Sequence, residues 1–184
     1  MVSRHRLTAV DSAILIVDIQ ERLAAVMPER DTLIKNTLHM IELAKLLHIP
    51  IILTEQYPKG LGRTVAGIRD ALPEYKPIEK TAFSACAEDG FIGNLRGCGR
   101  KKVILCGIET HICILQTCLD LLDSGYEVHV VSDCTSSRTA DNKAIALRQM
   151  AQCTAVITSV ETVLFQLLVR AGTDEFKIIS NRIK

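Results

Sequence analysis

A cysteine stands where an apolar, strand-like run gives way to a helical pattern. In "VILCGIETHICILQTCLDLL" (103–122), Cys113 opens the helical part. A thiol in the first turn of a helix feels the positive end of the helix dipole, which favours the nucleophilic thiolate. The position therefore indicates a nucleophile, and the alternative is the common role of cysteine as a small buried hydrophobe. If Cys113 is the nucleophile, we expect iodoacetamide to label it near neutral pH before the other six cysteines.

A nucleophilic thiol needs a base to take its proton and a cation to control that base. Asp18 lies in "AILIVDIQ" (13–20), an apolar run typical of a buried strand. It could be the base, or it could cap a helix or turn. Lys80, in the otherwise uncharged "KTAFSA", could be the cation or a solvated surface lysine. Spacing alone leaves both alternatives open.

Apolar runs alternate with helical patterns along the chain. The runs predict strands at 13–20, 49–56, 77–86, 101–108, 126–135 and 154–161. The helical patterns fall at 30–48, 87–97, 111–125, 139–152 and 160–172. This alternation predicts a three-layer α/β/α sandwich with a mainly parallel, doubly wound, six-stranded sheet, in a single domain over 1–184. Ligands bind at the carboxyl ends of such strands, where Asp18, Gln56, Ile108 and Asp133 lie.

Composition and charge exclude several classes of partner. The 22 basic and 21 acidic residues give a net charge of +1, so we expect neither nucleic-acid nor membrane-surface binding. No apolar run approaches the roughly 20 residues of a membrane span. The start of the chain lacks the apolar region of a secretory signal, which predicts a cytoplasmic protein, an organelle matrix such as the mitochondrion being compatible. The seven cysteines are then expected to be reduced.

The sequence shows no pattern for a cofactor or a metal ion. The place of a glycine-rich dinucleotide loop reads "DIQERL", and "GCGRKK" (97–102) precedes a strand instead of following one. The five histidines show no ligand spacing. We therefore expect no cofactor and no metal.

Three motifs resemble the isochorismatase-like cysteine hydrolases over essentially the whole chain. They are "LIVDIQ" (15–20), "EKTAFSA" (79–85) and "GIETHICILQT" (107–117), in that order. In addition, "TEQYPKGLG" (54–62) is similar to the subgroup of isochorismatase domain-containing proteins. Residue by residue, the resemblance implies a catalytic triad of Asp18, Lys80 and Cys113. It also implies a cis peptide bond between Ile108 and Glu109, and an oxyanion hole formed by the N–H groups of Glu109 and Cys113.

At two places the sequence differs from known groups of this family, and each difference restricts the reactions to be considered. The nicotinamidases of this family carry an Asp and two His after the second strand to bind a metal, whereas this chain has "EQYPKGLG", which argues against nicotinamide as substrate. True isochorismatases have glycine at the position of Cys113 and use the aspartate to protonate a vinyl ether. The cysteine here favours acyl transfer.

The sequence thus predicts a hydrolase that cleaves a small amide-like C–N bond in a small-molecule substrate. Cys113 would form a thioester, Asp18 would act as acid and base, and Lys80 would be its partner. The alternatives are a vinyl-ether hydrolase that uses Asp18 acid catalysis, and a non-catalytic scaffold of the same fold. Strand-end position makes Gln20, Gln56 and Tyr57 candidates for the substrate pocket, while Thr110 and His111 could face the pocket or cap the helix.

The expected helix 160–172 has more apolar surface than one sheet contact needs. Phe165 and Val169 fall outside its main apolar stripe, which suggests a second buried surface. Members of the resembling family are usually homo-oligomers, so we expect a dimer or a multiple of dimers. The alternative is that the tail "DEFKIISNRIK" covers Phe165 and Val169.

Overall fold

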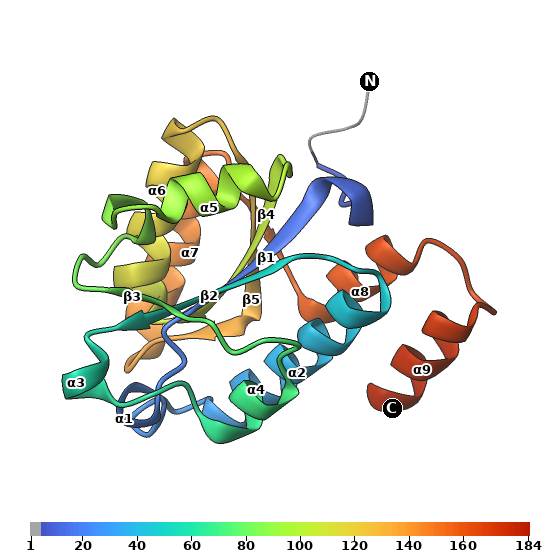
Figure 1. The fold of residues 1–184 in the computed structure, drawn as a ribbon, viewed down its shortest axis with the longest axis horizontal. Helices are drawn as coiled ribbons and strands as arrows, with labels where there is room; N and C mark the ends of the chain where they lie inside the picture. The colour runs from blue at the N-terminus through green and yellow to red at the C-terminus, as the bar shows by residue number, and fades with distance from the viewer. Residues whose placement is uncertain (1–4) are drawn as a thin grey trace.

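The computed structural model describes residues 5–184. The first four residues, which belong to the predicted domain 1–184 and to the N-terminal stretch used for the location, lie outside the described part. Six strands form one sheet in the order β3-β2-β1-β4-β5-β6. All of its ladders are parallel (Figure 1). The strands are β1 (Ser12–Val17), β2 (Ile51–Gln56), β3 (Ile78–Lys80), β4 (Lys102–Ile108), β5 (Glu127–Ser136) and β6 (Val156–Thr158).

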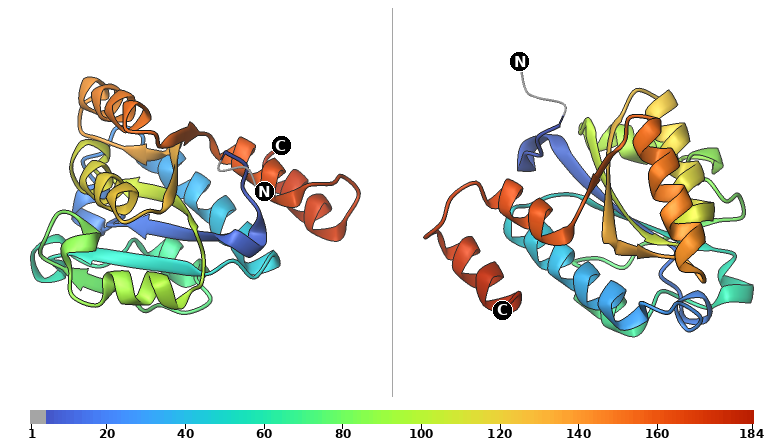
Figure 2. Two further views of the ribbon diagram at one scale, coloured as in Figure 1. Left: turned by 90° about the horizontal axis from the view of Figure 1, so that it is seen from above. Right: turned by 180° about the vertical axis from the view of Figure 1, so that it is seen from behind.

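Helices cover both faces of this sheet, which confirms the predicted α/β/α layers (Figure 2). On one side lie α2 (Arg30–Leu46), α4 (Ala66–Ala71), α8 (Val160–Leu168) and α9 (Asp174–Arg182). On the other lie α5 (Phe91–Gly97), α6 (Leu115–Asp123) and α7 (Ala140–Gln152). The short helices α1 (Glu21–Ala24) and α3 (Pro58–Leu61) follow β1 and β2.

The central strand β1 shows why the sheet needs both layers. All six of its residues are buried. Ile14 and Ile16 belong to the apolar cluster with α2 and α8, whereas Leu15 and Val17 belong to the cluster with α5 and α6. Side chains alternate between the faces of a strand, so a strand buried on both faces must be apolar throughout.

The order of the strands creates a switch point beside β1. The chain runs from β1 outward to β2 and β3, and then returns to place β4 on the other side of β1. Loops that leave the carboxyl ends of β1 and β4 therefore diverge, which leaves a place for a ligand between them. Asp18 follows β1, and the segment with Glu109 and Cys113 follows β4.

Several elements differ from the prediction. The expected strand 77–86 pairs with β2 only over Ile78–Lys80. The expected helix 111–125 is divided into a π-helical turn, Thr110–Ile114, and α6. The C-terminal tail forms α9, whose N-terminal Thr173 accepts a hydrogen bond from Phe176 N at 3.1 Å. Among residues 5–184, no helix is both long and apolar enough to span a membrane.

Helix α9 changes the reading of the apolar residues on α8. The rings of Phe165 and Phe176 meet edge to face with centroids 6.2 Å apart, so part of Phe165 is covered by the tail. Phe165 still exposes 43% of its surface and Val169 exposes 64%. The tail therefore covers part of Phe165 and leaves Val169 uncovered.

Candidate active site

Asp18, Lys80 and Cys113 come together at the switch point. Asp18 directly follows β1, Lys80 is the last residue of β3, and Cys113 lies in the π-helical turn after β4. All three are buried, with exposed fractions of 0%, 2% and 5%. Lys80 Nζ lies 2.7 Å from Asp18 Oδ2. Three residues that are far apart in the sequence thus form one buried cluster, below called the site cluster.

The Lys80 ammonium is surrounded by oxygen atoms. Besides the carboxylate of Asp18, it donates to the side-chain oxygen of Gln56 and to two main-chain carbonyls. The distances from Nζ are 2.6 Å to Gln56 Oε1, 3.2 Å to Ala82 O and 3.1 Å to Phe83 O. Because an ammonium has three N–H donors, these acceptors use its full capacity. Lys80 therefore acts on Asp18 inside the protein and has no donor left over for a ligand.

Burial and the hydrogen-bond partners of Asp18 have opposite effects on its pKa. Its Oδ1 accepts a hydrogen bond from Thr54 Oγ1 at 2.7 Å. Burial raises the pKa of Asp18 above its ordinary value, while the Lys80 charge and hydrogen bond, and then the Thr54 hydroxyl, act in the opposite direction. A carboxylate with a raised pKa that keeps a cation beside it is suited to accept a proton and return it.

The environment of Cys113 corrects the expectation of a resting thiolate. Burial first, and then the negative charge of Asp18, raise the pKa of the Cys113 thiol to about 12, with Lys80 opposing them. The helix-start argument fails because the thiol is desolvated and faces a carboxylate. Burial and the neighbouring Asp18 therefore favour the protonated thiol of Cys113 at neutral pH, and Lys80 opposes them.

The main chain between β4 and Cys113 has an unusual course. The Ile108–Glu109 peptide bond is cis. Glu109 Oε2 accepts hydrogen bonds from Arg138 N and Arg138 Nε, both at 3.1 Å, so the Glu109 carboxylate is bound to the loop after β5. Gly107 has φ +127°, and a Cβ there would lie 2.0 Å from Val17 O. Only glycine lets β4 approach β1 this closely beside the site cluster.

Comparison with known proteins identifies the family. The isochorismatase domain model matches residues 12–162, which contain the whole site cluster. The chain belongs to the isochorismatase family. A relative described as the secreted isochorismatase effector Isc1 of Phytophthora sojae is 45% identical over 185 residues, covering 97% of this chain and 87% of that protein.

Solved structures of this isochorismatase fold agree with the family assignment. The structure of the MAR1 ribonuclease from Caenorhabditis elegans has a TM-score of 0.90 and 38% identity, covering 97% of this chain and 92% of that one. The YcaC gene product of Escherichia coli, described as an octameric hydrolase of unknown specificity, has a TM-score of 0.89. It is 24% identical and covers 96% of this chain and 90% of that one, so it supports the fold alone.

The five candidates for the substrate pocket differ in burial and in their hydrogen-bond partners. Gln20 and Gln56 are buried, and their amides bind within the protein. The Thr110 hydroxyl is fully buried with no hydrogen-bond partner among residues 5–184. His111 Nδ1 lies 3.0 Å from Ser137 Oγ. Tyr57 is 55% exposed, and its N–H donates to Lys80 O at 2.8 Å.

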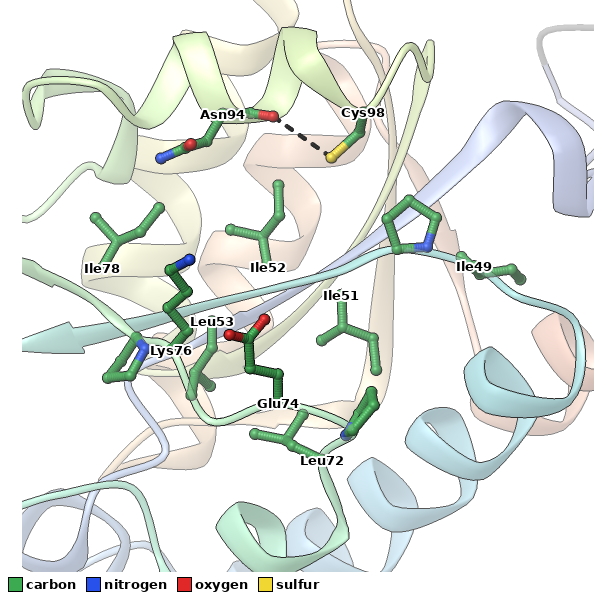
Figure 3. A pocket seen from close by; sticks show the side chains of 13 residues that line it. Ile49, Ile51, Ile52, Leu53, Leu72, Glu74, Lys76, Ile78, Asn94 and Cys98 are labelled. Carbon is green, nitrogen blue, oxygen red and sulfur yellow. Dashed lines mark hydrogen bonds between the residues drawn. The ribbon is translucent and has the colours of Figure 1, made fainter.

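Tyr57 and Lys80 share a cavity of about 320 Å³. Its lining residues are Tyr57, Pro58, Lys59, Glu79, Lys80, Thr81 and Glu88. A larger cavity of about 580 Å³ lies along Ile49–Leu53, under the loop before β3 and beside α5 (Figure 3). It contains none of the site cluster, and Cys98 at its rim donates to Asn94 O at 3.4 Å (Figure 3). Of the site cluster, only Lys80 lines the smaller cavity, and none of the three residues lines the larger one, so the candidate active site is defined by the contacts of the cluster and not by either cavity.

Sequence reasoning missed the residues that support the site cluster. Thr54 carries a hydroxyl inside the buried run "IILTEQ", which is a usable signal because a buried hydroxyl needs a partner. The carbonyls of Ala82 and Phe83 and the side chain of Arg138 gave no signal. Their roles depend on how loops fold back onto Lys80 and Glu109.

The raised pKa changes the expected order of thiol labelling. Cys153 is an exposed free thiol, whereas Cys113 is buried and protonated. We now expect iodoacetamide at neutral pH to label Cys153 first and Cys113 later. Peptide mass mapping over a time course measures this order. Labelling of Cys113 before Cys153 would show that the thiolate is favoured after all.

Proposed function

We propose that this isochorismatase-family protein is a hydrolase that cleaves a small amide-like C–N bond through a thioester on Cys113. Family membership supports hydrolytic activity. The observation that supports the thioester mechanism is the buried contact of Asp18 with Lys80. The Cys113 thiol also interacts with the Asp18 carboxylate through a side-chain hydrogen bond. A nucleophile, a base and a cation that holds the base are the parts that acyl transfer needs.

In the first half of the reaction, the Cys113 sulfur attacks the substrate carbonyl. Because the thiol is protonated at rest, Asp18 takes its proton as the C–S bond forms. The same proton then passes from Asp18 to the leaving nitrogen as the C–N bond breaks. Lys80 stays on Asp18 throughout and opposes the effect of burial on the Asp18 pKa, which favours the carboxylate form that acts as the base.

In the second half, water hydrolyses the thioester. Asp18 takes a proton from the attacking water, and the Cys113 sulfur leaves and regains its proton. We assign the oxyanion hole to the main-chain N–H groups of Glu109 and Cys113, because the N–H donors of Lys80 are already used by acceptors within the protein. Two such donors can contribute about 3–4 kcal/mol to lowering the barrier.

The buried cluster also bears on the other candidate reactions. A vinyl-ether hydrolase would use Asp18 as an acid and leave Cys113 without a role, and a scaffold would need neither. The structural relative from Caenorhabditis elegans is described as a ribonuclease. For this chain, the net charge of +1 and a Lys80 that is bound internally favour a small uncharged amide over RNA.

A panel of small amides, scored by ammonia release, tests the proposal. The same preparation should be assayed on a vinyl-ether substrate and on single-stranded RNA, each with wild type and Cys113→Ala. We expect at least one amide to be hydrolysed by wild type and not by the variant. Cleavage of RNA or of the ether that persists in Cys113→Ala, with no amide turned over, would reject the thioester mechanism.

We expect the activity to resist chelators. Among residues 5–184, no group of three or more His, Cys, Asp or Glu side chains is arranged to bind a metal ion, and the segment 57–64 has no histidine. Dialysis against EDTA should leave the rate of ammonia release unchanged. Loss of activity that added zinc or iron restores would show that the protein uses a metal site after all.

We also propose that the protein forms a homo-oligomer. The supporting observation is that two apolar side chains in and just after α8 stay exposed despite α9, Phe165 by 43% and Val169 by 64%. Light scattering at micromolar concentration should give a mass at least twice 20.3 kDa. A monomer at all concentrations would overturn this proposal and leave Val169 exposed to solvent. The predicted cytoplasmic location stays a prediction, and one relative is described as secreted.

A further inference from the structure

Gln56 is fixed through both its main chain and its side chain. Gln20 Oε1 accepts from Gln56 N at 2.7 Å, and Gln20 Nε2 donates to Gln56 O at 2.9 Å. The side chain of Gln20 thus binds Gln56 as a neighbouring strand would. At the other end, Gln56 Nε2 donates to Thr81 O at 2.8 Å. The residue therefore has little freedom to turn.

These contacts decide which atom of the Gln56 amide meets Lys80. Turning the amide over would place its NH₂ group against the ammonium and its oxygen against the carbonyl of Thr81, and both hydrogen bonds would be lost. Only one orientation satisfies the site. In that orientation, Gln56 Oε1 accepts from Lys80 Nζ at 2.6 Å.

The charge of this acceptor matters as much as its position. A buried ammonium needs hydrogen-bond acceptors, because desolvation costs several kcal/mol. Gln56 and the carbonyls of Ala82 and Phe83 satisfy this need with neutral oxygens. Asp18 is the only one of the four acceptors that carries a charge. The full positive charge of Lys80 is then opposed by a single carboxylate.

We propose that Gln56 is a positioning residue that aims the Lys80 ammonium at Asp18 and keeps its charge undivided. This assignment replaces the substrate-contact role that strand-end position predicted for Gln56. The proposal for Gln56 depends on the proposed function in one respect: it assumes that Asp18, Lys80 and Cys113 form the reactive site. Gln56 acts through Lys80 on Asp18 and Cys113 and does not touch the reacting atoms.

The test uses the chemistry of the Cys113 thiol and needs no substrate. The rate of Cys113 alkylation by acrylamide is measured by peptide mass mapping between pH 6 and 10 for wild type and Gln56→Glu. The new carboxylate has the same shape but divides the Lys80 charge, so Cys113 becomes harder to ionise. We expect alkylation to be about tenfold slower at each pH, equivalent to a shift of about one pKa unit. Gln149→Glu, the same change at an exposed position on α7, is the control and should match wild type.

A double-mutant cycle separates positioning from a merely structural role. Gln56→Met should slow Cys113 alkylation by more than about threefold in wild type and by less than about twofold in a Lys80→Met background, since Gln56 acts through Lys80. Equal losses in both backgrounds would overturn the proposal. A pH profile of Cys113 alkylation that is the same in Gln56→Glu and wild type would also overturn the proposal. This comparison remains valid even if a methionine variant fails to fold. Because alkylation is independent of turnover, either result holds whether or not the protein hydrolyses amides.

Discussion

Replacing Cys113 by alanine is expected to abolish amide turnover, with a loss of at least about 10³-fold in kcat/KM. In the proposed mechanism the Cys113 sulfur forms the covalent intermediate, so the variant lacks the atom that bonds to the substrate carbonyl carbon. The amide panel measures the rate, and thermal unfolding monitors the fold. The matched control is Cys118→Ala, which removes another buried thiol one helical turn further on, in α6, and should retain turnover.

Asp18→Asn should be as damaging as Cys113→Ala, because it removes the proton acceptor while keeping the shape of the side chain. The pair of variants distinguishes the candidate reactions. A vinyl-ether hydrolase would lose activity in Asp18→Asn and keep it in Cys113→Ala. Retention of more than a few per cent of turnover in Cys113→Ala would therefore favour the ether reaction.

Lys80→Met is expected to lower the free energy of unfolding by about 3–5 kcal/mol at pH 7 and to abolish turnover. Both partners of this ion pair are fully buried, so the variant leaves the carboxylate of Asp18 in the interior without its cation. Urea unfolding measures the change. The double variant Lys80→Met/Asp18→Asn removes both charges and should regain a large part of the lost stability. A double variant no more stable than Lys80→Met would show that packing, not charge, causes the loss.

The same variant should show a characteristic pH dependence. The pKa of Asp18 in the folded protein is already raised by burial and rises further when Lys80 is removed. A group whose pKa is higher in the folded state destabilises the fold only above its unfolded pKa, here 3.8. The stability difference between wild type and Lys80→Met should therefore be small near pH 4 and grow as the pH rises toward neutrality. A difference that is independent of pH would contradict this role of Asp18.

The layers of the fold could be predicted from the sequence because burial on both faces leaves a simple pattern. Runs such as "AILIV" have no polar face, so they require helices on both sides of the sheet. Ends of elements were harder to predict. The strand at 77–86 shortened to Ile78–Lys80 because the chain then folds back to bring the carbonyls of Ala82 and Phe83 onto the lysine.

The chemistry of the site cluster was less predictable than its members. Motifs identified Asp18, Lys80 and Cys113, and the parallel sheet brings them together: Asp18 follows β1, Lys80 ends β3 and Cys113 lies in the turn after β4. The protonation state of Cys113 was predicted wrongly, because the sequence shows its place at a helix start and not its burial beside a carboxylate. The positioning role that we propose for Gln56 could not be predicted from the sequence for a similar reason. Its position at the strand end faces the site, but its hydrogen bonds with Gln20 and Thr81 are visible only in three dimensions.

The thioester on Cys113 is the central claim, and trapping it is the most direct test. Wild-type protein is mixed with the amide that the panel identifies, quenched in acid within the first turnovers, and digested for mass spectrometry. We predict that the peptide containing Cys113 carries the mass of the acyl group, that hydroxylamine removes this mass, and that the Cys118 peptide stays unmodified. Sustained turnover with no acyl group on Cys113 at any quench time, when deacylation is slowed by low pH, would contradict the mechanism.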